Sequence, residues 1–355
     1  MVGEDVPHGC GLDELQSMSQ LRNLSISRLE NIMTGGIQPL NDKSYLRKIK
    51  LEWSKDVDHS LISVRTEEVC EDLSPPSSLE VLCFMFFPGL RFPQWMSMLP
   101  NLTYLSIYNC LSCQQLPPLG QLPQLRTLRI KGAPAVVTIG PEFLGCDTKD
   151  GLDHSGSSAA FPKLEELYLY SMPNLEEWAC DAKEVGDRRR ATIKLLPRLR
   201  ELKISECPKL RALPEGLEHA TALKICFIRR ADSLREIKNL GSLERLEVYD
   251  SPCLERISNL PALRELGVIN SWRMLKFVEN LNSLHTFRLD MDDDLIDCLP
   301  EWLLGLIQQG STSGALHTFI LHGVSQVLAS KCSEGGQYWT LLQGVPDFTL
   351  RPREY

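Results

Sequence analysis

The amino-acid sequence predicts an α/β solenoid, in which short repeats of a strand and a return segment stack along one axis. Three observations lead to this fold class. The frame Leu-x-x-Leu-x-Leu recurs along the chain, with Ile, Val, Phe or Cys replacing some of the leucines. Its apolar and polar residues alternate as they do in a short strand with one buried face. Most copies begin at intervals in or near the range of about 20–29 residues that is typical of stacked repeats with one strand each.

About twelve copies of the frame occur, and each predicts one strand. The clearest begin at Leu102, Leu125, Leu164, Leu199, Leu243 and Leu263, and weaker copies begin at Leu21, Leu46, Leu79, Leu223, Leu284 and Leu316. Neighbouring strands pack about 4.8 Å apart, whereas the bulkier return segments need more room, so the stack should bend. The predicted fold is a leucine-rich-repeat horseshoe, with a parallel sheet on its concave face and irregular, 3₁₀ or short helical returns on its convex face. Prolines such as Pro117 and Pro214 disfavour long helices in the returns.

The frame divides the chain into three parts. Residues 1–15 are predicted to be a loose N-terminal segment, residues 16–325 the leucine-rich-repeat domain, and residues 326–355 a C-terminal cap or tail. Polar stretches near residues 145–160 and 180–192 lengthen two of the repeats, so we expect insert loops there.

A small residue fills the position that follows many of the predicted strands. The residues at this position are Cys110, Ala133, Cys207, Ala231, Ser251 and Ser271. In other leucine-rich repeats an Asn occupies it and hydrogen-bonds the turn. We therefore expect a structural role for Cys110 and Cys207.

Composition and charge narrow the class of protein. The chain has 355 residues, a net charge of −8 and a pI near 5.5. A general nucleic-acid partner is not expected, because binding phosphates needs an excess of basic residues. No stretch reaches the ~18 apolar residues of a membrane span, and the acidic N-terminus does not resemble a secretory signal. The 12 scattered cysteines favour reduced thiols. We therefore expect a cytoplasmic protein without a membrane partner. An additional nuclear location stays open.

No motif predicts catalysis, a metal site or a cofactor. Cys110 and Cys113 form a lone Cys-x-x-Cys without the second pair that zinc needs. Residues Asp290 to Asp294 lack the Gly and the closing Glu of a calcium-binding EF-hand loop, so we interpret them as a solvated acidic turn. The seven histidines form no recognisable catalytic pattern. We therefore predict that the chain is not an enzyme.

The repeats resemble those of a known family. The stretches that carry the resemblance include Tyr104–Cys110, Leu116–Ile130, Phe161–Leu169 and Met172–Trp178. They are similar to the leucine-rich-repeat region of plant intracellular immune receptors, the coiled-coil, nucleotide-binding, leucine-rich-repeat disease-resistance proteins, over residues 12–325 or so. The chain has no Gly-x-x-x-x-Gly-Lys-Ser/Thr phosphate loop, so nucleotide binding is not carried over. It is expected to be the repeat half of such a receptor, as a truncated product, a partial sequence or an excised domain.

The resemblance implies protein–protein recognition in plant innate immunity. The expected partner is a pathogen effector or a host protein, and the repeats could also regulate a nucleotide-binding module in cis or in trans. Two alternatives stay open, a substrate-recognition adaptor of a ubiquitin ligase and a degenerate, truncated receptor fragment. Residues 1–20 are too short for the F-box-like segment of such an adaptor. An extracellular receptor ectodomain would need a signal peptide and a Gly-x-Ile-Pro pattern, which the sequence lacks.

The outward strand positions beside the buried leucines form the candidate binding surface. Tyr and Arg are enriched at interaction hot spots, although strands favour Tyr and Phe in any case. The candidate protein-binding residues on the concave face are Tyr104, Tyr108, Arg129, Lys131, Tyr168, Tyr170, Lys203, Phe227, Arg229, Arg245 and Tyr249.

Overall fold

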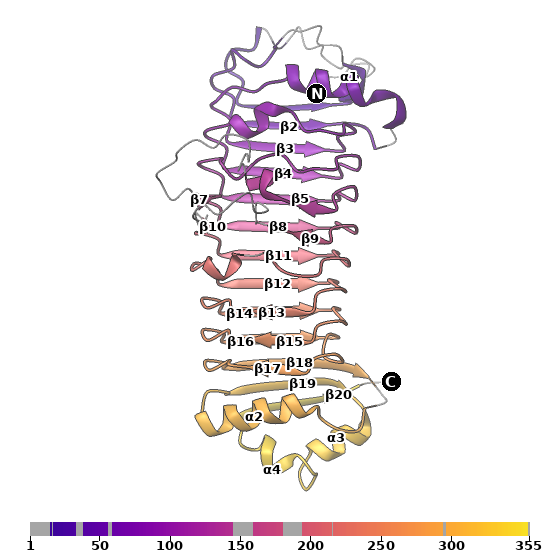
Figure 1. Cartoon of the computed structure of the whole chain (residues 1–355), viewed down its shortest axis with the longest axis vertical. Helices are drawn as coiled ribbons and strands as arrows, with labels where there is room; N and C mark the ends of the chain where they lie inside the picture. Colours follow the sequence, from indigo (N-terminus) through magenta and orange to yellow (C-terminus); the bar gives the residue numbers. More distant parts are fainter. Residues whose placement is uncertain are drawn as a thin grey trace, which may run out of the picture. The chain divides into compact units, whose positions relative to one another are not determined.

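The computed structural model divides into two compact units. Unit 1 comprises Met1–Leu199 and Pro214–His219, and unit 2 comprises Arg200–Leu213 and Ala220–Tyr355. The structure describes residues 15, 17–32, 38–55, 59–144, 159–179, 194–214, 216–293 and 296–353 (Figure 1). The predicted insert loop near 180–192, all but two residues of the one near 145–160, and the N-terminal segment apart from Leu15 lie outside the described residues.

Unit 1 is a ladder of short parallel strands, one for each copy of the sequence frame. The strands pair in the order β1 (Asn23–Ser27), β2 (Lys48–Glu52), β3 (Val81–Met85), β4 (Tyr104–Tyr108), β5 (Thr127–Lys131) and β8 (Glu166–Tyr170). Leu105 pairs in register with Leu128, and Leu128 with Leu167. All three side chains are fully buried, so the predicted inward phase of the frame is confirmed.

Unit 2 continues the same pattern within itself. Its strands pair in the order β11 (Glu201–Ser205), β12 (Ile225–Arg229), β14 (Arg245–Tyr249), β16 (Glu265–Ile269), β18 (Thr286–Asp293), β19 (Thr318–Val324) and β20 (Asp347–Pro352). The inward column changes from leucine to phenylalanine toward β20, where the rings of Phe287 and Phe319 stack at 5.4 Å and those of Phe319 and Phe348 at 5.5 Å. The predicted α/β solenoid is therefore the observed fold.

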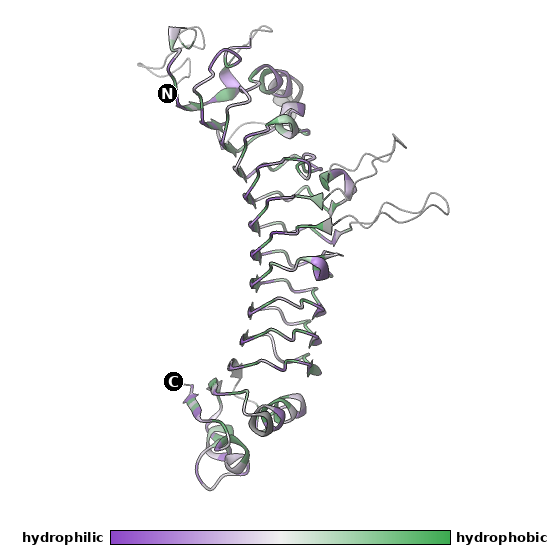
Figure 2. Ribbon diagram, turned by 90° about the vertical axis from the view of Figure 1, so that its left-hand side faces the viewer, coloured by the Kyte–Doolittle hydropathy of each residue, from purple (hydrophilic) through white to green (hydrophobic). Residues whose placement is uncertain are grey.

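The return segments are mostly short, as predicted. In each unit the strands of the ladder lie on one side of the coil and the returns on the other (Figure 2). The returns contain the 3₁₀ turns η2 (Leu29–Asn31), η3 (Gln94–Met98), η4 (Pro141–Leu144) and η5 (Leu217–His219). They also contain the small parallel sheets of β6 (Thr138–Ile139) with β9 (Glu177–Trp178), β7 (Ala159–Ala160) with β10 (Lys194–Leu195), and β13 (Glu236–Lys238), β15 (Arg256–Ser258) and β17 (Phe277–Glu279).

Helices occupy the repeats in which the frame is widely spaced. Helix α1 (His59–Asp72) lies between β2 and β3, and α2 (Glu301–Ser313) lies between β18 and β19. The shorter α3 (Gln326–Cys332) and α4 (Trp339–Leu342) connect β19 to β20. Extra residues between two strands of fixed spacing can coil into a helix outside the ladder without disturbing it.

Two details near β18 and β20 differ from the sequence-based expectations. Asp290 to Asp293 belong to β18, and Asp293 still pairs with Val324 of β19. The predicted acidic turn is therefore wrong for these residues, because the ladder extends the strand beyond the repeat frame. In addition, β20 lies in the segment expected to be a cap or tail, where Val345-Pro-Asp-Phe348-Thr-Leu350 is a further copy of the frame that the sequence-based count missed.

A left-handed residue ends most strands of the ladder. The residue after the strand has a positive φ angle at Asn109 (50°), Gly132 (73°), Glu206 (58°), Arg230 (50°), Asp250 (47°) and Asn270 (52°). This conformation reverses the chain direction at the end of the strand and points the next side chain back into the coil. Only one of these positions is a glycine, so the neighbouring hydrogen bonds must stabilise an otherwise unfavourable backbone.

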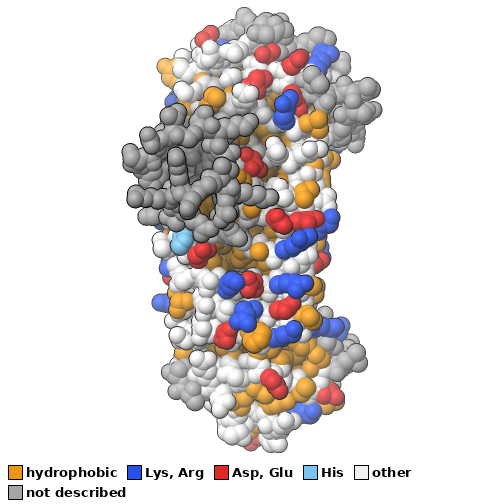
Figure 3. Space-filling view, viewed as in Figure 1, with side chains coloured by type: hydrophobic (Ala, Val, Ile, Leu, Met, Phe, Trp, Pro, Cys, Tyr) orange, Lys and Arg blue, Asp and Glu red, His pale blue; other side chains and the backbone are white. Residues whose placement is uncertain are grey.

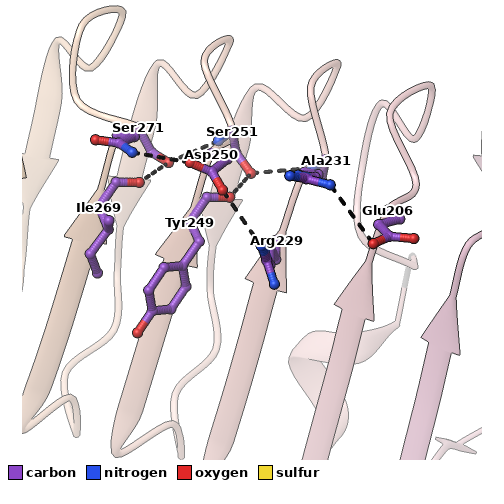
Figure 4. Close-up of polar contacts among 10 residues, drawn as sticks. Glu206, Arg229, Ala231, Tyr249, Asp250, Ser251, Ile269 and Ser271 are labelled. Carbon is purple, nitrogen blue, oxygen red and sulfur yellow. Dashed lines mark hydrogen bonds and ion pairs between the residues drawn. The ribbon is translucent and has the colours of Figure 1, made fainter. Parts of the chain in front are cut away.

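The small residue that follows supplies those hydrogen bonds. Ser251 Oγ donates to the Tyr249 carbonyl at 3.0 Å and accepts from the Ala231 N–H at 3.3 Å (Figure 4). One repeat further on, Ser271 Oγ donates to the Ile269 carbonyl and accepts from the Ser251 N–H, both at 2.9 Å. Each hydroxyl thus closes its own turn and binds the turn of the preceding repeat.

Cysteine makes the same contact in other repeats. Cys110 Sγ donates to the Tyr108 carbonyl at 3.8 Å, and Cys207 Sγ donates to the Ser205 carbonyl at 3.6 Å. Both side chains are buried. The predicted structural role of Cys110 and Cys207 is therefore confirmed.

Candidate functional site

Alternation along the strands places the candidate residues of unit 1 in adjacent columns. Successive side chains of a strand point to opposite faces, and strands β4, β5 and β8 pair residue by residue. Ser106, Arg129 and Tyr168 therefore form the central column. One side column contains Tyr104, Thr127 and Glu166, and the other contains Tyr108, Lys131 and Tyr170.

The candidate residues of unit 1 form an aromatic–cation cluster that consists of two adjoining groups, one around Arg129 and one around Tyr108. We use this name for Phe86, Tyr104, Tyr108, Arg129, Lys131, Tyr168 and Tyr170. The Arg129 guanidinium lies 5.7 Å from the Tyr104 ring centroid and 4.8 Å from that of Tyr168. The Lys131 ammonium lies 5.3 Å from the Tyr108 ring. Cation–π contacts of this kind hold long cationic side chains in place on an exposed surface.

The sequence-based prediction missed Phe86. Its ring lies 5.4 Å from that of Tyr108 in an edge-to-face arrangement. Phe86 occupies the left-handed position after β3, with φ of 60°, so it lies outside the strand alternation that identified the other residues. Comparing the residues that directly follow each predicted strand would have identified Phe86 as a candidate.

Tyr168 is not the free side chain that the sequence predicts. It is only 5% exposed, and its ring stacks on that of Tyr170 at a centroid distance of 6.1 Å. Its hydroxyl donates to Glu166 Oε2 at 3.1 Å. The outward column is crowded by large side chains at this point, and Arg129 covers the ring. The prediction that Tyr168 is exposed for a partner is therefore wrong, and the residue instead supports Arg129 and Tyr170.

The candidate residues of unit 2 are mostly held by carboxylates. Arg245 Nη2 lies 2.6 Å from Glu265 Oε2, Arg229 Nε lies 3.8 Å from Asp250 Oδ2, and Lys203 Nζ lies 2.5 Å from Glu201 Oε1. Basic and acidic side chains also lie next to one another on the opposite, return side, which is the face drawn in Figure 3. Exposed pairs of this kind contribute little to stability, but they neutralise one another and leave little unbalanced charge at these positions.

An aromatic pair lies among these ion pairs. The rings of Phe227 and Tyr249 are 5.2 Å apart, and the Tyr249 hydroxyl donates to Glu247 Oε2 at 2.9 Å. Partial burial, followed by the hydrogen bond to Glu247 and the charge of that carboxylate, raises the pKa of Tyr249. The phenol therefore stays neutral and acts as a hydrogen-bonding aromatic surface.

Cys110 and Cys113 lie in buried surroundings that favour the neutral thiol. Burial raises the pKa of Cys110 to about 12, and burial together with nearby acidic groups raises the pKa of Cys113 further still. Cys113 Sγ donates to the Gly89 carbonyl at 3.0 Å. A nucleophilic cysteine reacts as the thiolate, and burial disfavours that form at both positions. Among the described residues, no cluster of three or more His, Cys, Asp or Glu side chains could hold a metal ion.

None of the helices in the described part of the chain has the length and apolar character that crossing a membrane requires.

Repeated strands, stacked leucines and an outward face of aromatic and charged side chains define a leucine-rich-repeat protein. Residues 12–133 match the family described as R13L1/DRL21 leucine-rich repeats. In its repeats the chain is similar to the leucine-rich-repeat regions of plant NLR-type disease-resistance proteins.

Similar proteins carry these repeats as part of longer chains. Disease resistance protein RGA2 of Solanum bulbocastanum is 30% identical over 247 residues, which cover 68% of this chain and 24% of that protein. Disease resistance RPP13-like protein 4 of Arabidopsis thaliana is 32% identical over 104 residues, which cover 28% of this chain and 12% of that protein. The chain thus spans about a quarter or less of these relatives.

Known structures with a related architecture are also leucine-rich-repeat proteins. The leucine-rich-repeat domain of the type III effector XopL matches with a TM-score of 0.41 and 19% identity, covering 62% of this chain and 66% of that one. An internalin, InlF, from Listeria monocytogenes matches with a TM-score of 0.37 and 13% identity, covering 97% and 89%. These similarities are too distant to inform function.

Proposed function

We propose that the chain is a protein-recognition module of plant innate immunity that acts in the cytoplasm, without catalytic activity of its own. Its partner would be a pathogen effector or a host protein, bound on the outward face of the strands. Two findings support this proposal. The relatives that share its repeats are disease resistance proteins, and the outward face carries aromatic and arginine side chains of the kind that dominate binding energy at protein interfaces.

The observation that carries the proposal is the aromatic–cation cluster of unit 1. Tyr104 and Tyr108 are half-buried and Arg129 is exposed. Arg129 Nη2 lies 4.0 Å from Glu166 Oε2, so a partner's carboxylate would share the guanidinium with Glu166. Arg129 is held between two tyrosine rings, which reduces the conformational freedom that it would lose on binding. A pre-positioned guanidinium between aromatic rings favours a partner that offers a carboxylate next to an apolar side chain.

A nucleotide-binding module is the second partner to consider. The matched relatives are four or more times longer than the segment that they share with this chain. If such a module binds the repeats in cis or in trans, it would compete with an effector for the same face. The assay must therefore include both kinds of partner.

The proposal is tested with the full chain in a purified binding assay. The probes are a panel of purified effector proteins from plant pathogens and a purified fragment of RGA2 that precedes its repeats, measured by biolayer interferometry. A charge reversal, Arg129→Glu, should weaken a bound probe by at least about tenfold, because it removes a central hot-spot residue. The matched control is Arg91→Glu, which changes an arginine that is 86% exposed and lies outside the strands.

The control variant should bind like the unaltered chain. Equal affinity of both variants and the unaltered chain would exclude the strand face of unit 1 as the binding surface. Absence of binding to every probe in both classes would remove the support for recognition of effectors or of a nucleotide-binding module.

A further inference from the structure

Two histidines lie side by side at the start of neighbouring strands in unit 2. His285 directly precedes β18 and His317 directly precedes β19, and the His317 N–H donates to the His285 carbonyl at 2.9 Å. The two rings are nearly parallel, with centroids 5.0 Å apart and an interplanar angle of 13°. Both side chains are exposed. The two residues are far apart in the sequence, so the pairing of β18 with β19 brings them together (Figure 1).

A threonine follows each histidine and contacts the same nitrogen of its ring. His285 Nδ1 lies 3.4 Å from Thr286 Oγ1, and His317 Nδ1 lies 3.4 Å from Thr318 Oγ1. Thr318 Oγ1 in turn donates to Asp347 Oδ2 at 3.4 Å. When each Nδ1–H donates to its threonine, each Nε2 keeps a free lone pair. Acceptors behind the other ring nitrogen orient metal-binding histidines in this way.

From this arrangement we propose that His285 and His317 chelate one divalent transition-metal ion through their two Nε2 atoms. Metal–nitrogen bonds are about 2.0–2.1 Å long, so one ion can bridge two nitrogens that are at most about 4.2 Å apart. The stacked rings are 5.0 Å apart and have the same orientation relative to their threonines. Small rotations of the two exposed side chains therefore bring both nitrogens onto one ion.

The ligand chemistry selects the class of ion. Neutral imidazole suits Cu²⁺, Ni²⁺ and Zn²⁺, whereas Ca²⁺ and Mg²⁺ require oxygen ligands. No cluster of three or more His, Cys, Asp or Glu side chains occurs in the described parts of the chain, so water completes the coordination shell. Arg264 precedes the neighbouring strand on one side, and Asp347 lies in the neighbouring strand on the other. These opposite charges offset each other, so the affinity depends on the two imidazoles.

A bound ion would join two strands that are separated by a helical insertion. Helix α2 lies in the connection from β18 to β19, and the two histidines mark the starts of these strands. A ligand that binds only the folded state stabilises that state. The ion would therefore act as a removable cross-link at the repeat that carries α2.

The test uses the full chain without an affinity tag, with isotope-labelled histidine rings and NiCl₂ as the probe. Ni²⁺ is paramagnetic, so in nuclear magnetic resonance spectra it should broaden the ring signals of His285 and His317 together, before those of the other histidines. Because the signals are resolved by residue, binding of Ni²⁺ at thiols elsewhere does not affect the result. In His285→Gln the affinity for Ni²⁺ at His317 should fall by about tenfold or more, because the second imidazole no longer acts at a high effective concentration.

The matched control is His219→Gln. His219 is another exposed histidine, and its Nε2 lies 3.9 Å from Glu218 Oε1, so it tests whether a histidine beside a single acidic group is sufficient. This variant should leave the response of His285 and His317 unchanged. Broadening of the two signals at separate Ni²⁺ concentrations, or an unchanged affinity at His317 in His285→Gln, would overturn the proposal. This outcome does not depend on the partner assays of unit 1.

Discussion

The hydrogen bonds of Ser251 allow a direct test of what ends each strand. The side chain is fully buried and bonds to the Tyr249 carbonyl and the Ala231 N–H (Figure 4). In Ser251→Ala, the Tyr249 carbonyl keeps the bond from the Arg230 N–H, but the Ala231 N–H loses its partner inside the coil. Leaving one buried donor unsatisfied costs about 1–3 kcal/mol. We expect this loss in the free energy of unfolding, measured by urea denaturation.

Hydrogen exchange of the Ala231 amide locates the effect. A loss of about 1–3 kcal/mol should speed hydrogen exchange of the Ala231 amide by about 5- to 150-fold if the turn opens locally. Ser251→Cys should restore most of the stability, because Cys110 and Cys207 make the equivalent contact in their own repeats. Ser283→Ala, at an exposed serine of the same unit, is the control. If the free energy of unfolding of Ser251→Ala lies within about 0.5 kcal/mol of that of the control, the serine does not stabilise the turn.

Three further predictions concern Leu128, Tyr168 and Cys110. Leu128→Asp should unfold unit 1, because it buries an unpaired charge in the inward column. Tyr168→Ala should lower the free energy of unfolding by about 1.5–3 kcal/mol, because it removes a buried aromatic ring, and an unchanged thermal transition would contradict the burial of that ring. The pKa of Cys110 is raised from 9.0 to about 12 by burial, so the folded state holds this proton more tightly than the unfolded state. The stabilisation is complete below pH 9 and is lost as the pH rises toward about 12. Cys110→Ser should therefore be less sensitive to alkali in pH-dependent unfolding, and equal sensitivity would show that the thiol does not titrate in that range.

The inward half of the fold could be predicted from the sequence. Every strand of the two ladders from β1 to β19 coincides with a copy of the Leu-x-x-Leu-x-Leu frame. The reason is that alternation in a strand has a period of two, so a single leucine frame fixes which residues face the core. The role of Cys110 and Cys207 followed from the same spacing, because a small side chain is needed where the chain turns back.

The remaining features depend on contacts that periodicity does not encode. The burial of Tyr168 results from its neighbours Arg129 and Tyr170, and an outward position alone does not predict such crowding. Strand β20 was missed for another reason: its copy of the frame, Val345-x-x-Phe348-x-Leu350, contains a single leucine. The left-handed residues after the strands are mostly Asn, Asp, Arg or Glu rather than Gly, so composition did not reveal the turns.

A second polar ladder shows how the returns keep the same spacing as the strands. Asn239, Asn259 and Asn280 all have positive φ angles, of 60°, 56° and 59°. Asn259 Nδ2 donates to Asn239 Oδ1 at 3.0 Å, and Asn280 Nδ2 donates to Asn259 Oδ1 at 2.7 Å. Asn259 both donates and accepts, so the row links three successive repeats at the interval of the stack. The frame of leucines and the row of asparagines therefore impose one common repeat on opposite sides of unit 2.

If the outward face is the recognition surface proposed above, its residues can change while the fold is kept. The coil is stabilised from inside by stacked leucines and by the small residues that follow the strands, such as Ser251. The asparagine row stabilises it from the return side. Exposed outward residues such as Arg129 contribute little to that stability, because exposed polar contacts are weak. Substitutions there can alter the partner at small cost, whereas a crowded outward residue such as Tyr168 cannot be exchanged as freely. Selection for new partners should therefore act on the exposed outward positions and spare those that support them.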